Sequence, residues 1–260
     1  MTEVDKMKEE FIISPNLPQG RASLVLMSGR RPAAAEELSR LGIRRTDPGR
    51  LEGISGAEGY HADMSFCHIG GNRLFFASNG DPSAVSRLSS EGFSLTPADS
   101  PVTAKRPSLN VCIIGNKVLC DTRTADEELL RLLSGEGHKV LHTNQRYTRC
   151  SSAVLGNNAI ITSDPSVYAL CKENGIDVLK ICPGYIELDG YEYGFIGGCC
   201  GLLSPDTLAF SGRIGLHPDY ENIRSFAGEY GIELLSLSDE PLYDVGGIIA
   251  LKAFGTDDFV

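Results

Sequence analysis

The sequence predicts an α/β fold of five ββαβ units that form a closed, five-bladed propeller, and three observations lead to this prediction. A polar helical segment that ends in glycine and is followed by a short apolar strand occurs five times. An apolar hairpin precedes four of these helices. The first unit lacks one strand, whereas the C-terminus carries one strand to spare. Repeats of this kind define the architecture of a whole chain.

The ends of the predicted helices carry matching signals. Each helix ends at a position that favours a left-handed residue, and the five glycines there are Gly42, Gly92, Gly137, Gly175 and Gly231. At the start of one helix, Asp164 is an N-cap candidate and Pro165 occupies the first turn. Segments 79–88 and 216–223 follow the same pattern, and segment 122–133 places acidic residues in the first turn.

Each hairpin consists of two apolar runs around a turn of Gly-Asn, Asn-Asn or Pro-Asp type, which is a strong hairpin signal. The four segments read FCHIGGNRLFFAS, VCIIGNKVLCDT, SAVLGNNAIITS and GLLSPDTLAFSG. Residues 22–29 form only one strand before the first helix, so we expect residues 245–254 to pair with them and close the ring, which removes exposed sheet edges. The alternative is an open sheet of parallel strands. We predict a single domain over 1–260, with an N-terminal arm (1–21) and the ring (22–254).

The composition narrows the classes of partner. The 260 residues carry a net charge of -10, which disfavours general binding to nucleic acid or to an anionic membrane surface. The first residues, MTEVDKMKEEF, contain no apolar signal segment, and no apolar run reaches the length of a membrane span. We therefore expect a cytoplasmic protein. None of its eight cysteines forms a C-x-x-C pair, and we expect reduced thiols, no metal site and no cofactor.

Aligning the starts of the repeats separates buried cysteines from candidate reactive ones. Cys67, Cys112, Ser152 and Cys200 occupy equivalent positions, and small side chains in such a set indicate core packing. Asn110, Cys150 and Gly198 each lie two residues before one of these positions. If the strands already include them, they lie on the same face of the strands as the core positions.

Cys150 is the first candidate for a nucleophile. It follows Arg146, Tyr147 and Arg149, and nearby positive charge is expected to lower the pKa of its thiol. Cys199 is the second candidate, because the neighbouring Gly198 would let a ligand approach the backbone. The alternative for both is a structural cysteine.

Polar residues elsewhere complete the candidate site. His61 and Asp63 would share one face of a strand and form a proton-transfer pair, or else belong to a polar loop. Asp244 is the equivalent acid in the last unit, with a solvated turn as its alternative.

Basic residues also gather at the strand starts. Arg106, next to Lys105, together with Arg146 and Arg149 would form an anion site, or else be solvated surface side chains. Segment 183–195 is rich in tyrosine and either covers the mouth of the ring or packs locally.

Five ββαβ units closed by a C-terminal strand resemble the pentein fold of the guanidino-group-modifying enzymes. The strings HADMSF (61–66), GFIGG (194–198) and YDVGGIIALK (243–252) also look family-like. The resemblance implies a Cys nucleophile, a His for proton transfer, and carboxylates that hold a guanidinium. In the enzymes that Cys lies on the terminal strand, where this chain reads GGIIALK. Cys150 or Cys199 would therefore take its role.

Three functions remain open from the sequence. The chain is an enzyme for a guanidino or amidino small molecule, a non-catalytic pentein that binds a small ligand, or a protein-binding module. The basic and acidic residues at the mouth favour a zwitterionic, amino-acid-like ligand. The sequence leaves the oligomeric state open.

Overall fold

The computed structural model describes residues 8–255, in which the strands form five small sheets. Four of them have three strands each, and the fifth has four. The three-stranded sheets comprise β4 (Phe66–His68), β5 (Arg73–Phe76) and β6 (Ser94–Pro97); β7 (Cys112–Ile114), β8 (Lys117–Cys120) and β9 (Lys139–His142); β10 (Ala153–Gly156), β11 (Ala159–Thr162) and β12 (Asp177–Lys180); and β13 (Cys200–Ser204), β14 (Thr207–Phe210) and β15 (Glu233–Ser236). In each, the first two strands are antiparallel and the last two are parallel.

The fifth sheet joins the two ends of the described chain. Its order is β1 (Glu9–Phe11), β16 (Ile249–Phe254), β2 (Ala22–Leu26) and β3 (Arg44–Thr46). Strand β16 runs antiparallel to β2, with Ile249 opposite Leu26 and Ala250 opposite Val25. The predicted pairing of the two ends is therefore confirmed. Strand β1, in the predicted arm, adds to the free side of β16.

The expected helix signals are mostly present. The long helices are α1 (Pro32–Arg40), α3 (Pro82–Ser90), α4 (Glu127–Gly135), α5 (Pro165–Glu173) and α6 (Tyr220–Gly228). Asp81, Asp126 and Asp164 accept hydrogen bonds from main-chain N–H groups at the starts of α3, α4 and α5. The five glycines predicted to end these helices all have positive φ. Asp219, at the N-cap of α6, does not cap that helix with its side chain.

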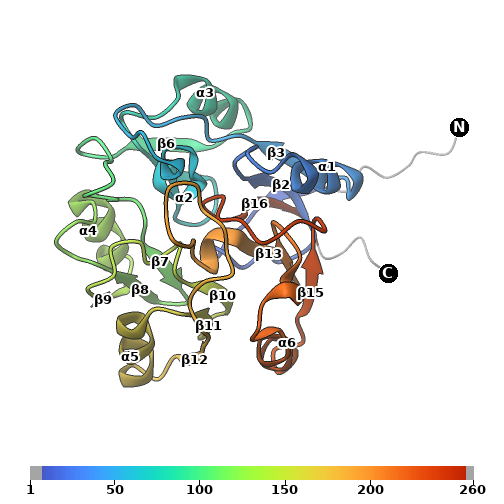
Figure 1. Cartoon of the computed structure of the whole chain (residues 1–260). Helices are drawn as coiled ribbons and strands as arrows, with labels where there is room; N and C mark the ends of the chain where they lie inside the picture. The colour runs from blue at the N-terminus through green and yellow to red at the C-terminus, as the bar shows by residue number, and fades with distance from the viewer. Residues whose placement is uncertain (1–7, 256–260) are drawn as a thin grey trace, which may run out of the picture.

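The long helices lie at the outside of the molecule and the strands lie inside (Figure 1). Five apolar clusters fill the spaces between sheets. Each unites residues of two sheets, as Phe75 of β5 and Ile113 of β7 do. Each sheet can be named by its central antiparallel pair of strands. The clusters then connect β4–β5 with β7–β8, β7–β8 with β10–β11, β10–β11 with β13–β14, β13–β14 with β2–β16, and β2–β16 with β4–β5. The sheets are separate, and none closes on itself within residues 8–255.

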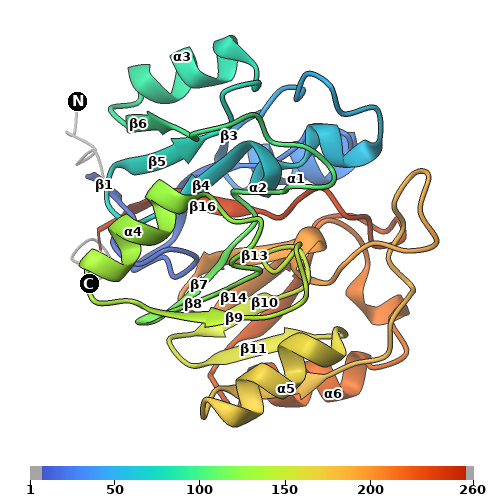
Figure 2. The ribbon, with the colours of Figure 1, turned by 90° about the vertical axis from the view of Figure 1, so that its left-hand side faces the viewer.

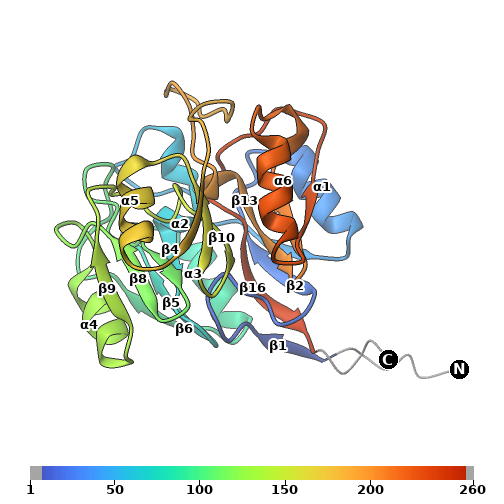
Figure 3. The same cartoon turned by 90° about the horizontal axis from the view of Figure 1, so that it is seen from below.

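The two ends of the fold differ. Segment 183–195, drawn in orange, projects from the end opposite to the chain termini (Figures 2 and 3). Short helical turns precede two strands: η1 (Ala57–Tyr60) and α2 (Ala62–Ser65) come before β4, and η2 (Gly197–Cys199) comes before β13. A third, η3 (Ile214–Leu216), leads into α6. None of the helices between residues 8 and 255 combines the length and apolar character needed to cross a bilayer.

Candidate active site

Four of the predicted site residues converge on one point inside the molecule. They come from three different units: His61 and Asp63 at α2, Asn110 before β7, and Cys150 before β10. All four side chains are buried, and Cys150 has 1% of its surface exposed. The equivalence of Asn110 and Cys150, inferred from the repeat, thus corresponds to neighbouring positions in space.

Three polar side chains surround the sulfur of Cys150. The thiol donates to Asp63 Oδ2 over 2.8 Å, and Asn110 Nδ2 donates to the sulfur over 3.2 Å. His61 Nδ1 lies 4.0 Å from the same atom. Asn110 is itself fixed, because its Oδ1 accepts from the main-chain N–H groups of Arg149 and Cys150. The amide therefore has its NH₂ group directed at the sulfur.

The local backbone differs from the expectation for His61 and Asp63. We expected either a strand or a polar loop, whereas His61 is the N-cap of the short helix α2 and Asp63 lies in its first turn. The main-chain N–H of Asp63 donates to Gly246 O, which ties this turn to the last unit. Asn110 and Cys150 likewise lie in turns before their strands, and Gly198 lies in η2. The strands therefore begin later than predicted, at Cys112, Ala153 and Cys200.

Asp244 completes the centre from the closing unit. Its Oδ1 lies 3.6 Å from His61 Nδ1, and the carboxylate accepts from the N–H groups of Phe195 and Gly246. Gly198 and Gly246 must both be glycine, because the neighbouring side chains leave no room for a Cβ. A Cβ on Gly198 would lie 2.0 Å from Asp244 Oδ1, and one on Gly246 would lie 2.3 Å from His61 Cβ. The Asp244 carboxylate occupies the space beside Gly198 where we expected a ligand to approach the backbone.

The electrostatics of Cys150 contradict the expected activated thiol. Burial raises its pKa well above the ordinary value, and the charges of Asp63 and Asp244 raise it further. The expected lowering by arginine fails because the guanidinium of Arg149 donates to the main-chain oxygens of Ser152 and Gly197, and Arg146 is exposed. Burial also raises the pKa of Asp63, to about 6. The Cys150 thiol therefore holds its proton in this environment.

Arg149 lies among the small buried residues that the repeat placed at equivalent positions. Burial raises the pKa of Cys67 to about 12, of Cys112 to about 11 and of Cys200 to about 12, while the charge of Arg149 acts in the opposite direction on all three. Their predicted role in the core is confirmed by their burial. Arg149 is therefore a buried cation beside the centre, and not an exposed side chain at the mouth of the ring.

The side chains of two other predicted ligand-binding residues donate to main-chain oxygens. Arg146 donates to Lys105 O, and Arg106 Nε donates to Thr124 O. Neither contact involves Arg149, and the anion site of basic residues stays a prediction. Cys199 is buried in an apolar cluster, where its thiol donates to Ile196 O.

Two aromatic side chains lie near the centre. The Tyr147 hydroxyl donates to Ala104 O, and its ring stacks on Phe195 with centroids 6.5 Å apart. Burial and then the Cys150 charge raise the pKa of Tyr147, in keeping with a place close to the thiol. Phe195 is the last residue of the tyrosine-rich segment 183–195, but the sequence did not single it out. Tyr191 and Tyr193 are exposed at 50% and 36%, so they are not packed into the core.

The centre has little free space. A cavity of about 20 Å³ is lined by Asp63 and Arg149, and one of about 10 Å³ by Arg149 and Cys200. Asn16 of the N-terminal arm borders both, and its side chain donates to Ile113 O. The first cavity has room for about one water molecule. A ligand would therefore have to displace part of the cover over Cys150.

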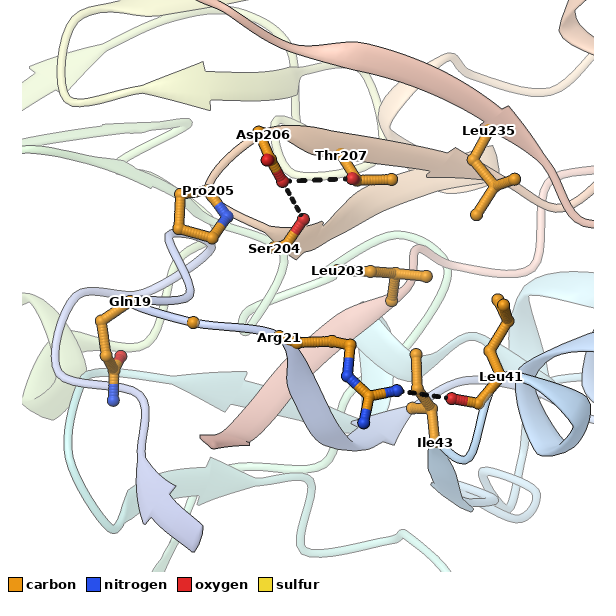
Figure 4. Close-up of a pocket in the computed structure, with 11 residues that line it drawn as sticks. Gln19, Arg21, Leu41, Ile43, Leu203, Ser204, Pro205, Asp206, Thr207 and Leu235 are labelled. Atoms are coloured by element: carbon orange, nitrogen blue, oxygen red, sulfur yellow. Dashed lines mark hydrogen bonds between the residues drawn. The ribbon is translucent and has the colours of Figure 1, made fainter. Parts of the chain in front are cut away.

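A wider groove lies elsewhere and shares no residue with the centre (Figure 4). Its volume is about 520 Å³, and Leu41, Ile43, Leu203 and Leu235 supply its apolar lining. Arg21 borders it and donates to Leu41 O.

Two groups of side chains in the described part of the chain have the composition of metal ligands, although linear spacing indicated none. One is His61, Asp63 and Cys150, and the other is Cys182, His217 and Asp219. In the first group, His61 Nε2 and Asp63 Oδ1 are buried without a hydrogen-bond partner. The same two atoms are available to an organic ligand.

Solved structures with a similar fold are guanidino-group-modifying enzymes. An amidinotransferase from Microseira wollei in the saxitoxin biosynthetic pathway has a TM-score of 0.54 at 11% identity, covering 87% of this chain and 91% of its own. The inosamine-phosphate amidinotransferase of Streptomyces griseus has a TM-score of 0.56 at 12% identity, covering 95% and 98%. DDAH from Pseudomonas aeruginosa, in complex with citrulline, has a TM-score of 0.54 at 8% identity, covering 90% and 100%.

These similarities show that the chain has the pentein fold, as its sequence resemblance implied. At such low identity they show the fold alone. No curated protein sequence matches the chain. Residues 26–249, which include every residue around Cys150, match the family described as "Family of unknown function (DUF6873)", and the chain belongs to this family.

Proposed function

We propose that the chain is an enzyme that acts on a guanidino or amidino small molecule through Cys150. The observation that carries the proposal is the convergence of Asp63, Asn110 and His61 on the Cys150 sulfur, at 2.8, 3.2 and 4.0 Å. A thiol, a carboxylate and an imidazole in one buried group supply a nucleophile, a cation-binding acceptor and a proton carrier. Cys199 is not part of this group, so we propose Cys150 alone as nucleophile.

The charge of the centre favours a cationic ligand. Asp63 and Asp244 are buried carboxylates, and Arg149 is the buried cation beside them. With both carboxylates ionised and His61 neutral, these groups carry one uncompensated negative charge. A buried charge without a partner is energetically costly. Binding of a planar cation beside these carboxylates would compensate the charge and is therefore favoured. Asp63 Oδ1, which has no partner, is the acceptor that we assign to its N–H group.

Binding of such a cation would also activate the thiol. Burial comes first among the causes that raise the Cys150 pKa, and the carboxylates of Asp63 and Asp244 follow. A guanidinium or amidinium between the carboxylates and the sulfur would offset the second contribution. We therefore expect the thiolate to form with the ligand in place, rather than in the free protein.

The proposed reaction proceeds in two steps. The thiol proton passes to Asp63 Oδ2, the sulfur forms a bond to the central carbon of the guanidinium, and a C–N bond breaks as the departing amine takes up the proton held by Asp63. Water then attacks the same carbon with loss of one proton to His61. The C–S bond breaks as the C=O bond forms and the second water proton is released, and the sulfur regains its proton from His61. Asn110 Nδ2 stabilises the negative sulfur in both steps.

We further infer that the five sheets act as a closed ring around this centre. The five apolar clusters connect the sheets pairwise in a cycle, and β16 pairs with β2. In this arrangement the starts of β4, β7, β10 and β13 face a common axis, which supports side chains from several units meeting at Cys150. All eight free cysteines fit the reducing cytoplasm, which we propose as the location of the protein.

Two alkylating reagents of nearly equal shape test the proposed cation site. Chloroacetamidine carries a planar amidinium, whereas chloroacetamide is neutral. We expect the ratio of their labelling rates at Cys150, measured by mass spectrometry on the native protein, to exceed the ratio on the urea-unfolded chain about 10-fold, which is about 1.4 kcal/mol of charge recognition. Asp63→Asn should bring the ratio back to that of the unfolded chain.

Turnover is the second part of the test. A panel of guanidino compounds is assayed for release of ammonia or amine with the native protein, Cys150→Ser and Cys199→Ser. We expect activity in the native protein and in Cys199→Ser, whose hydroxyl retains the donor to Ile196 O. Equal labelling ratios in folded and unfolded protein would contradict the cation site. A raised ratio without turnover of any compound would favour a non-catalytic pentein that binds the same class of ligand.

A further inference from the structure

A second group of potential ligands lies outside the Cys150 centre. Cys182 follows β12, His217 lies between η3 and α6, and Asp219 is the N-cap of α6. One side-chain donor atom from each residue lies within 4.8 Å of the other two. His217 is buried at 2% exposure, whereas Cys182 and Asp219 are half-buried. The group is therefore close to the surface and open to a small ion.

Asp219 departs from the role that its counterparts play. Asp81, Asp126 and Asp164 cap their helices through the side chain, an interaction that stabilises a helix by about 1 kcal/mol. The Asp219 carboxylate instead turns toward Cys182 and accepts from its main-chain N–H over 2.7 Å. At α6 the proline precedes the N-cap residue, as Pro218-Asp219, whereas Pro82 and Pro165 follow theirs, and the carboxylate of Asp219 is left to bind outside the helix.

His217 supplies an independent observation. Its Nδ1 accepts from the main-chain N–H of Asp219 over 3.1 Å, but its Nε2 is buried without a hydrogen-bond partner. A buried polar nitrogen without a partner costs about 1–3 kcal/mol. The ring of Tyr185, which has a left-handed backbone with φ of 63°, contacts the imidazole edge-on with centroids 5.8 Å apart. The imidazole is thus held in place while one of its nitrogens lacks a partner.

We propose that Cys182, His217 and Asp219 bind a divalent transition metal ion, with Zn²⁺ as the best match. Thiolate, imidazole and carboxylate are the three ligand types that zinc takes in proteins, and three protein ligands leave a fourth, open position. Metal–ligand bonds of about 2.0–2.3 Å require the three donor atoms to move about 1 Å closer together than 4.8 Å. All three residues lie outside regular helices and strands, where such a shift is least costly.

The bound ion would connect two parts of the molecule. Cys182 immediately precedes segment 183–195, which leads to Phe195 and its contact with Asp244, whereas His217 and Asp219 belong to the start of α6. Coordination would therefore fix the beginning of this segment against the last helix. The site shares no residue with the Cys150 centre.

Cobalt is a suitable probe, because Co²⁺ replaces Zn²⁺ and a Co²⁺–thiolate bond gives a near-ultraviolet charge-transfer band. The full chain, reduced and freed of metal with a chelator, is titrated with CoCl₂ and then with ZnCl₂. We expect one Co²⁺ per chain, a charge-transfer band, and its loss when Zn²⁺ displaces cobalt. Cys182→Ser should remove the band, and His217→Gln and Asp219→Asn should each weaken Co²⁺ binding at least 10-fold.

The matched control is Cys150→Ser, which removes the thiol of the other Cys–His–Asp group. This variant should retain the band and the affinity. Circular dichroism of each variant verifies that the fold is kept, and a rise in Tm on adding Zn²⁺ to the native chain but not to Cys182→Ser gives a readout independent of cobalt. Absence of the band from the native chain, its persistence in Cys182→Ser, or its loss in Cys150→Ser would each overturn the assignment.

Discussion

Replacing Asp63 with asparagine should make the protein more stable at neutral pH, although it removes a proposed functional carboxylate. Asp63 is 1% exposed, and burial raises its pKa from 3.8 to about 6. A carboxyl group whose pKa is higher in the folded state binds its proton more tightly there. The folded state is therefore favoured at low pH, and this advantage is lost as the pH rises from 3.8 to about 6.

The magnitude follows from the two pKa values. At about 1.36 kcal/mol per pH unit, ionised Asp63 destabilises the fold by about 3 kcal/mol above pH 6. At pH 4 most of this penalty is absent, because the folded carboxyl is protonated. Asparagine has nearly the same shape, retains an oxygen that accepts from the Cys150 thiol, and has no charge at either pH.

Urea unfolding of the native protein and Asp63→Asn at pH 4 and pH 7.5 measures the effect. We expect the difference in unfolding free energy between variant and native protein to shift by about 2–3 kcal/mol in favour of the variant on going from pH 4 to pH 7.5. Comparing the two pH values cancels any pH-independent change caused by the new amide group.

Asp121→Asn is the matched control, because the pKa of Asp121 is shifted the other way. The Arg123 side chain donates to its carboxylate and lowers that pKa, so the ion pair stabilises the fold above pH 3.8 and is lost as the pH falls below it. Because pH 4 and pH 7.5 both lie above 3.8, Asp121→Asn should be about equally harmful at the two pH values. If Asp63→Asn likewise showed no shift in its favour between pH 4 and pH 7.5, burial would not dominate at Asp63 and our account of the centre would be refuted.

Two further outcomes are expected. Gly246→Ala should lower the unfolding free energy by at least 1 kcal/mol more than Gly53→Ala, because both positions have positive φ but only Gly246 would bring a Cβ against His61; equal losses in urea unfolding would assign the whole effect to backbone strain. Neutral iodoacetamide should label Cys182 of the metal-free native protein before Cys150, because Cys182 is half-buried and the other seven cysteines are buried; faster labelling of Cys150 by mass spectrometry would contradict the protonated, covered thiol.

Much of the fold was predictable because its signals are local or follow from pairing rules. The glycines that end the helices and the caps at Asp81, Asp126 and Asp164 act within one turn of chain. Pairing of residues 22–29 with 245–254 followed from a missing strand at one end and a spare one at the other. Strand β1 was missed because Glu9–Phe11 has two exposed acidic residues and no apolar alternation.

The sequence predicted that Cys150 and Asn110 would occupy equivalent places in their units, but it did not predict the electrostatics around the thiol. Repeat alignment located Cys150 and Asn110, since equivalent positions of related units face the same way. The pKa of Cys150 was predicted in the wrong direction because sequence proximity to Arg149 does not tell where that side chain points, and its guanidinium contacts main-chain oxygens instead. The group around Cys182 was missed because His217 and Asp219 lie more than 30 residues away in sequence.

The geometry of the closing unit explains why a nucleophile on the terminal strand would conflict with this centre. Gly246 lies against His61, where any Cβ would collide. Ile248, before β16, and Ile249, its first residue, are buried in apolar clusters between sheets. The closing unit supplies Asp244 and backbone in place of a thiol. Since the starts of several units approach the same centre, a cysteine at the start of β10 can reach it from another direction. The proposed reaction centre therefore depends on which side chains meet, and not on which unit contributes each of them.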